Sequence, residues 1–161
     1  MLKRNDQSSE TNKIVISGLV LYMHVLRFVA HRKTILIVED NNDSRDLLAK
    51  FIILFGYDAI EADSGREAIG KALEMHPDLI LMDMYLPDLI GAKIIACLKA
   101  NPATRDIPVI ITSAFLERTV RNHALRAGAV EILEKPFSIT IMREVLDRYL
   151  TTDESKENRC G

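Results

Sequence analysis

The sequence has too few cysteines for a disulfide framework, and its histidines are scattered. The two cysteines, Cys97 and Cys160, lie far apart, and none of the four histidines has the spacing of a metal-ligand motif. A disulfide-stapled domain and a zinc domain are therefore excluded, and we expect a protein of the reducing cytoplasm. Cys97 lies in an apolar helical pattern, which predicts a core position for it.

The chain also lacks an excess of positive charge. It has 21 basic and 23 acidic side chains, and residues 34–150 are mildly acidic. Neutralisation of phosphates by Lys and Arg supplies most of the affinity of nucleic-acid-binding proteins, so we expect no nucleic-acid partner. Residues 151–161 form a polar tail that is too short for another domain, and we expect no output through direct DNA binding.

A long hydrophobic run is absent as well. Residues 14–30 are apolar but interrupted, whereas a membrane-spanning helix needs roughly 20 apolar residues. The interrupting residues are Ser17, Gly18, His24 and Arg27. We expect residues 1–33 to lie outside the folded core, either as a loosely attached extension or as a segment upstream of the working start. A packing or oligomerisation helix is an alternative, and membrane attachment is the least favoured interpretation.

What the sequence does contain is a regular alternation of strand-like and helix-like segments over residues 34–150. Short apolar runs are typical of strands buried on both faces of a parallel sheet, and apolar residues recur at helical spacing between them. This alternation favours an α/β fold with right-handed crossovers. The expected strands are residues 34–38, 57–61, 79–82, 109–112 and 130–134. The expected helices are residues 43–55, 68–75, 90–100, 115–127 and 138–150.

Two local signals mark helix ends within this pattern. Gly56 suits the position after the first helix, where a left-handed backbone is common. Ser64 and Glu67 have the spacing of a capping box, which predicts reciprocal hydrogen bonds at the start of the second helix.

Reactive polar residues follow four of the strands. Glu39 and Asp40 come after the first expected strand, Asp83 after the third, Ser113 after the fourth and Lys135 after the fifth. In a parallel sheet all strand carboxyl ends lie on one edge, where ligands bind. We therefore expect three carboxylates, a hydroxyl and an ammonium group to meet at one site.

The carboxylates suit phosphoryl transfer to an aspartate. A carboxylate such as that of Asp83 can attack phosphorus and form an acyl phosphate, provided that its negative charge is offset. Mg²⁺ prefers hard oxygen ligands. Asp40, Asp83 and the backbone carbonyl of Tyr85 can supply them, with Glu39 acting through water. Reactions of this kind depend mostly on positioning and charge neutralisation.

Two further residues suit contact with the transferred group. Lys135 is a point charge on a long stem, which can pair with Asp83 at rest and with phosphoryl oxygens afterwards. Ser113 can donate a charge-assisted hydrogen bond to a phosphoryl oxygen. Alone, each would be an ordinary surface lysine or strand-end cap, so the prediction depends on the whole set.

These residues resemble the receiver domain of two-component response regulators, of the stand-alone single-domain type. The matching motifs are Glu39-Asp40, Asp83-Met-Tyr-Leu-Pro87 with Gly91, Ser113-Ala114 and Lys135-Pro136-Phe137. The resemblance covers essentially all of residues 34–150. It implies a flavodoxin-like, doubly wound sheet of five parallel strands in the order 2-1-3-4-5 with five helices. It also implies a cis peptide before Pro136.

The resemblance further implies a function. A sensor histidine kinase or a phosphotransfer protein would donate a phosphoryl group to Asp83, dependent on Mg²⁺ or Mn²⁺. The protein would be a signalling phosphoacceptor rather than an enzyme, with only metal-dependent self-phosphorylation and self-dephosphorylation. When phosphorylated it would bind an unknown downstream protein, and it could dimerise. The residues that carry over are Asp40, Asp83 and Tyr85 for the metal with Glu39 beside them, and Ser113 and Lys135 for the phosphoryl group.

Some positions depart from the family pattern. Ile132 stands where an aromatic residue usually turns inward on activation, so a switch in this chain would need a smaller repacking. The family's output face, helix 4 to helix 5, is the corresponding guess for partner binding. Tyr85 and Phe115 flank the expected site without a carboxylate or amide to align an attacking water. This predicts slow loss of phosphate from Asp83.

Three other classes compete with this interpretation. A phosphorylation-independent adaptor with a receiver fold is the main alternative, because Ile132 is unusual for a switching receiver. A haloacid-dehalogenase-like hydrolase would have a second aspartate where Tyr85 stands. A nucleotide- or flavin-binding protein would cradle phosphate in the loop after its first strand, whereas the loop from Glu39 to Asp43 is acidic.

Overall fold

Five short strands, most of them apolar, form one parallel sheet. The computed structural model describes residues 32–114 and 117–150. The strands are β1 (Thr34–Val38), β2 (Asp58–Ala62), β3 (Leu79–Asp83), β4 (Val109–Ser113) and β5 (Glu131–Glu134). Their order is β2-β1-β3-β4-β5, and every neighbouring pair is parallel. The expected fold class and strand order are therefore confirmed.

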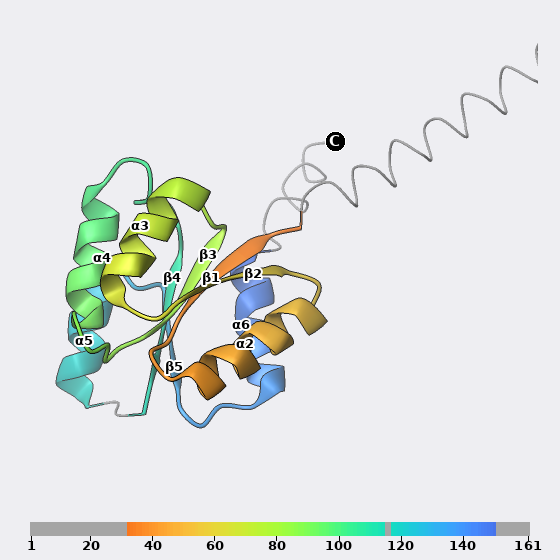
Figure 1. Cartoon of the computed structure of the whole chain (residues 1–161). Helices are drawn as coiled ribbons and strands as arrows, with labels where there is room; N and C mark the ends of the chain where they lie inside the picture. The colour runs from red at the N-terminus through yellow and green to blue at the C-terminus, as the bar shows by residue number, and fades with distance from the viewer. Residues whose placement is uncertain (1–31, 115–116, 151–161) are drawn as a thin grey trace, which may run out of the picture. The chain divides into compact units, whose positions relative to one another are not determined.

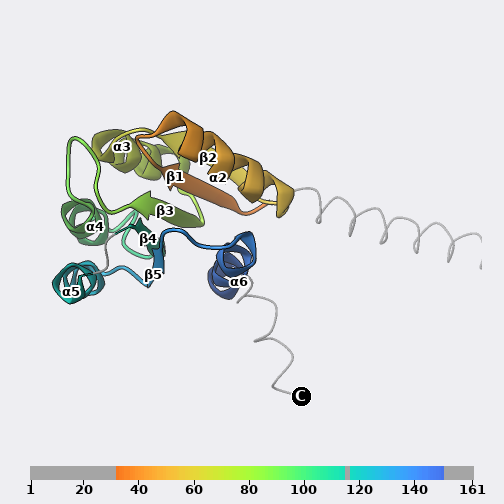
Figure 2. The same ribbon diagram turned by 90° about the horizontal axis from the view of Figure 1, so that it is seen from below.

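Helices cover both faces of this sheet (Figure 1). Within the described residues they are α2 (Asn42–Leu54), α3 (Gly65–Met75), α4 (Gly91–Ala100), α5 (Arg118–Ala127) and α6 (Ile139–Leu150). Figure 2 shows the strands running between α2 and α6 on one side and α3, α4 and α5 on the other. The layers explain why the inner strands β1, β3 and β4 are almost entirely apolar, whereas the edge strands β2 and β5 carry acidic residues.

Alternate residues of each strand enter two separate cores. In β1, Ile35 and Ile37 pack under α2 and α6, whereas Leu36 and Val38 pack under α3, α4 and α5. All four side chains are almost fully buried. This alternation follows from the two-residue period of a strand. It fixes the register of β1 between β2 and β3 in the interior of the sheet, next to the strand ends that carry the polar residues.

Several element ends and one core position differ from the expectation; α3, for example, begins at Gly65 rather than at residue 68. The capping box is wrong: the Ser64 side chain makes no capping hydrogen bond, and the Glu67 carboxylate accepts from Asp63 N at 2.8 Å instead. The core position of Cys97 is also wrong, because α4 buries its opposite side and leaves this thiol exposed. The second strand begins one residue later than expected, at Asp58. Gly56 does follow the end of α2, with φ +91°.

The features expected at the two chain ends fall outside the part of the chain that the structure describes. Residues 1–31 and 151–161 lie outside the described residues, as does Phe115. Among the residues that the structure describes, no helix is long and apolar enough to span a membrane.

A hydrogen bond between Tyr57 and Asp147 gives the first testable prediction. The Tyr57 hydroxyl donates to Asp147 Oδ1 at 2.6 Å and joins the start of β2 to α6. Burial, together with the hydrogen bond to Asp147, raises the pKa of Tyr57 well above its ordinary value of 10.0. Because the folded-state pKa is raised, this contribution to stability is complete below pH 10 and is lost as the pH rises towards the folded-state value.

We expect Tyr57→Phe to lower the free energy of unfolding by about 1 kcal/mol at neutral pH. Above pH 10 the gap between variant and wild type should shrink, because only the wild type loses this contribution. Urea unfolding of both proteins at neutral pH and above pH 10 measures both effects. An equal gap at both pH values would contradict the assignment.

Candidate functional site

The carboxyl ends of β1 and β3 bring Glu39 and Asp83 next to each other. Val38 pairs with Met82 in the parallel register, so the residues that follow, Glu39 and Asp83, occupy neighbouring positions at the same edge. Glu39 is buried, at 4% exposure, and the backbone N–H of this residue still bonds to β2 through Ala62 O at 3.1 Å. The sheet therefore holds two carboxylates close together at one edge, as expected.

Lys135 lies between these two carboxylates. Its Nζ donates to Glu39 Oε2 at 2.7 Å and also contacts Asp83 Oδ2. Burial lowers the pKa of Lys135, but the hydrogen bonds to Asp83 and Glu39 outweigh burial and leave the pKa raised. The ammonium is thus charged at neutral pH and offsets two like charges that would otherwise repel each other.

The remaining oxygen of Asp83 is held by the loop that follows it. The backbone N–H of Tyr85 donates to Asp83 Oδ1 at 2.7 Å. The loop is closed by a hydrogen bond from Gly91 N to Met84 O at 2.9 Å and by a bridge between Tyr85 and Ile90. The Tyr85 side chain is half exposed beside the site. Asp83 is therefore oriented by a side chain on one oxygen and by the backbone on the other.

Ser113 and Lys135 are joined through the backbone at the end of β4. Lys135 N donates to Ser113 O at 2.8 Å, and Ser113 pairs with Glu134 in the β4–β5 ladder. The Ser113 side chain is buried, at 1% exposure. The peptide between Lys135 and Pro136 is cis, which confirms that expectation. Ser113 thus belongs to the same edge as the three charged residues.

Asp40 is the expected site residue that the structure does not draw into this cluster. Its side chain is exposed in the loop between β1 and α2. Within the described residues, no group of three carboxylate, imidazole or thiol side chains is arranged to hold a metal ion. The donor chemistry nevertheless suits Mg²⁺, because carboxylate oxygens of Glu39 and Asp83 already share one cation, the Lys135 ammonium.

Sequence reasoning missed the residue that secures the acidic loop. Arg45, in the first turn of α2, donates from Nη1 to Glu39 O at 2.7 Å, from Nη2 to Asn42 Oδ1 at 2.7 Å and from Nε to Glu61 Oε2 at 3.3 Å. Local spacing could not predict the contact with Glu61, because Glu61 lies on β2 whereas Arg45 lies on α2. Asn41 caps α2 by accepting from Ser44 N at 2.9 Å.

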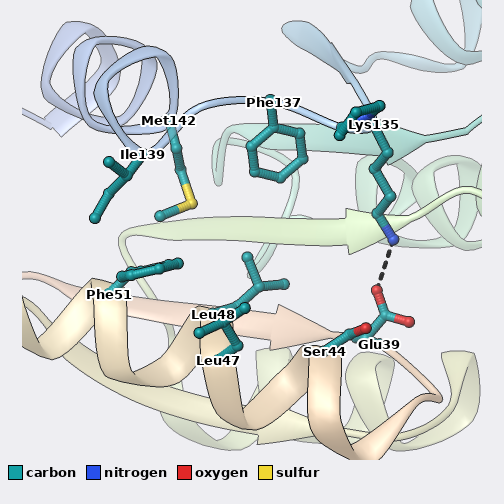
Figure 3. A pocket seen from close by; sticks show the side chains of 10 residues that line it. Glu39, Ser44, Leu47, Leu48, Phe51, Lys135, Phe137, Ile139 and Met142 are labelled. Atoms are coloured by element: carbon teal, nitrogen blue, oxygen red, sulfur yellow. Dashed lines mark hydrogen bonds and ion pairs between the residues drawn. The ribbon is translucent and has the colours of Figure 1, made fainter.

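An apolar groove of about 320 Å³ opens beside Lys135 and Glu39. Figure 3 shows the Lys135–Glu39 ion pair at one end, with apolar side chains from α2 and from the start of α6 along the groove. These apolar side chains include Leu47, Phe51 and Ile139. The site therefore has a charged edge next to an apolar surface.

Ile132 packs close to Ser113 on the face of the sheet that α3, α4 and α5 cover, opposite the apolar groove. It is buried in the core under α3, α4 and α5, and it lines a narrow pocket with Ser113, Met84, Val120 and Ala124. Ala124 is the one residue of α5 that is buried. The aliphatic side chain lines this narrow space without a ring.

Comparisons with known proteins agree with this geometry. A family profile described as the response regulator receiver domain matches residues 35–147. The polar-differentiation response regulator DivK of Brucella ovis is 37% identical over 118 residues, which are 73% of this chain and 96% of that protein. The protein of the same name from Brucella anthropi is 36% identical over the same length.

Solved structures place the fold in the same group. The receiver domain of the sensor histidine kinase PA1611 from Pseudomonas aeruginosa, solved with a magnesium ion coordinated in its active-site cleft, is 29% identical. It covers 76% of this chain and 100% of that chain, with a TM-score of 0.71. The chemotaxis protein CheY4 of Vibrio cholerae is 23% identical over 74% of this chain and 100% of its own, with a TM-score of 0.71, and supports the fold alone.

The family assignment follows from both the sequence and the arrangement of the strand ends. The profile spans most of the chain, and it includes each of the strand-end residues Glu39, Asp83, Ser113 and Lys135. The relatives match almost over their whole length. The chain belongs to the response regulator receiver domain family of two-component systems.

Proposed function

We propose that this chain is a receiver that accepts a phosphoryl group on Asp83. The observation that carries the proposal is the contact of Lys135 Nζ with the Glu39 and Asp83 carboxylates at one sheet edge. A structural ion pair would need one carboxylate. Two carboxylates around one ammonium leave an oxygen-rich site next to a group that can neutralise an added phosphoryl charge.

In the proposed reaction an Asp83 carboxylate oxygen attacks the phosphorus of a phosphohistidine. A new O–P bond forms as the donor's N–P bond breaks, and the electron pair of that bond returns to the imidazole nitrogen. Lys135, released from Asp83, keeps its charge and moves to the phosphoryl oxygens. The Ser113 hydroxyl donates to another of these oxygens, and this charge-assisted hydrogen bond stabilises the new negative charge.

Receiver domains bind Mg²⁺ in the active site, and we propose the same for this chain. Asp40 and Asp83, with the Tyr85 backbone carbonyl, would hold the ion, and Glu39 would act through water. When bound, Mg²⁺ offsets the negative charge of the carboxylates and of the incoming phosphoryl group. Mn²⁺ offers the same oxygen-binding chemistry.

The phosphodonor in this proposal is a sensor histidine kinase or a histidine phosphotransfer protein, and the protein acts in the cytoplasm. In this proposal residues 34–150 form the receiver, and Lys33 already contacts it through a hydrogen bond from Asp58 N and an ion pair with Asp78. The proposal includes no nucleic-acid or membrane partner. The output is phosphorylation-dependent binding of a downstream protein, with dimerisation as a further possible output.

The switch itself would differ from one that uses an aromatic ring. Ile132 lines a narrow space beside Ser113, so movement of Ser113 towards a phosphoryl group would be followed by a small repacking of Ile132 and α5. This helix is the obvious element to move, because Ala124 is its one buried residue. An adaptor that ignores phosphorylation is the competing proposal, and its partner binding would be unchanged in Asp83→Asn.

The direct test is the intact mass of the full chain after incubation with acetyl phosphate and Mg²⁺. We expect one phosphoryl adduct in the wild type and none in Asp83→Asn or without metal. Asp106→Asn is the matched control, because it removes a carboxylate that is 92% exposed and remote from the site, and it should be labelled normally. Absence of an adduct, also with a cognate kinase, would refute the proposal and favour the adaptor.

A second prediction concerns the lifetime of the phosphorylated state. Tyr85 lies beside Asp83 without a group that can align an attacking water, so hydrolysis should be slow. We expect Tyr85→Asn to speed the loss of phosphate on the order of tenfold by orienting that water. Tyr85→Phe retains the ring and should decay like the wild type. Time-resolved intact mass measures the rate at which each protein loses phosphate. Equal rates in all three proteins would contradict the prediction.

A further inference from the structure

Asp88 joins two segments that are far apart in the sequence. It lies in the loop between β3 and α4, and its carboxylate accepts two hydrogen bonds from the start of α3. Gly65 N donates to Oδ1 at 2.8 Å, and Arg66 N donates to Oδ2 at 3.0 Å. The first amides of a helix have no partner within the helix, so this carboxylate satisfies two of them.

The loop also packs closely against the start of helix α3, so the contact between them does not depend on the Asp88 side chain alone. A Cβ atom on Gly65 would lie 2.5 Å from Ile94 Cδ1 and 3.2 Å from Leu89 Cβ. Leu89 follows Asp88 directly, and Ile94 is a buried residue of α4. The missing side chain at Gly65 lets the loop approach the backbone whose amides Asp88 accepts.

The same loop is closed on itself between Asp88 and the phosphoacceptor. Gly91 N bonds to Met84 O, and Tyr85 forms an antiparallel bridge with Ile90. A Cβ atom on Gly91 would lie 3.0 Å from Met84 Sδ and 3.2 Å from Met84 Cα. The two arms of the loop therefore pack against each other, and a shift of its tip would reach Tyr85.

We propose that Asp88 is a positioning residue for the phosphoacceptor site. By anchoring the loop on α3, it holds the Tyr85 N–H against Asp83 Oδ1 and keeps the Tyr85 carbonyl where it can face a metal ion. Asp88 acts through the loop and does not touch the reacting groups. The role in phosphorylation rests on the function proposed above, whereas the effect on the loop does not.

The test compares Asp88→Ala with Glu67→Ala in the full chain. Glu67 is the matched control, because it accepts from Asp63 N and pairs with Lys71 at the start of the same helix, without touching the loop. Both variants weaken the first turn of α3, but Asp88→Ala alone frees the loop. Asp88→Asn retains one acceptor oxygen and should give an intermediate effect.

Two measurements are made on unphosphorylated protein. In metal-free protein, NMR hydrogen exchange should be about threefold faster at the Tyr85 amide in Asp88→Ala than in the wild type, which is the loss expected for one capping group. Calorimetric titration should show a dissociation constant for Mg²⁺ that is raised by a similar factor. Glu67→Ala should match the wild type in both.

The rate of labelling by acetyl phosphate is the third measurement, and we expect it to fall about threefold in Asp88→Ala. Wild-type exchange at Tyr85 in a folded Asp88 variant would overturn the proposal, as would equal effects in Glu67→Ala. If no protein is labelled, the phosphoacceptor function fails, while amide exchange and Mg²⁺ affinity still decide the role of Asp88.

Discussion

The site depends on one ammonium group shared by two carboxylates. Glu39 and Asp83 leave neighbouring parallel strands at the same level, and the Lys135 Nζ between them offsets their charges. Glu39 is buried, and a buried carboxylate without a positive partner is costly. The cation at this position is therefore a condition for the fold as much as for the proposed chemistry. In the proposed reaction, the charge that stabilised the resting pair would be available for the incoming phosphoryl group.

The loops around this ion pair are fixed by contacts between side chains and the backbone of other elements. Arg45 holds the loop after β1 through Glu39 O, and Asp88 holds the loop after β3 through the first amides of α3. Together they limit the freedom of the two loops that carry the proposed metal ligands. Receivers that share the four strand-end residues can therefore differ in how firmly these loops are held. Ile132 adds a second difference, because an aliphatic side chain lines the narrow space beside Ser113.

Much of the fold and the site could be predicted from the sequence. The apolar runs located every strand to within about one residue, and the polar residues at their ends indicated the site, because parallel strands present them on one edge. The strand order came from the resemblance to receivers rather than from the pattern. Cys97 was misplaced because a mostly apolar helix does not reveal which side is buried. The capping box at Ser64 failed, since the Glu67 carboxylate accepts from Asp63 N, and Asp88, 24 residues later in the chain, accepts from the first two amides of the helix. Contacts of this kind depend on tertiary packing, which local spacing does not encode.

The most direct test of the shared-cation constraint is the free energy of unfolding of Lys135→Met, measured with and without Mg²⁺ beside the wild type. Without metal the variant should be less stable by roughly 2 kcal/mol, since Glu39 loses its buried partner while part of the site remains in contact with water. Saturating Mg²⁺ should reduce this difference, because the metal can take over the neutralisation of the two carboxylates. A variant as stable as the wild type without metal, or a difference that Mg²⁺ leaves unchanged, would contradict the account.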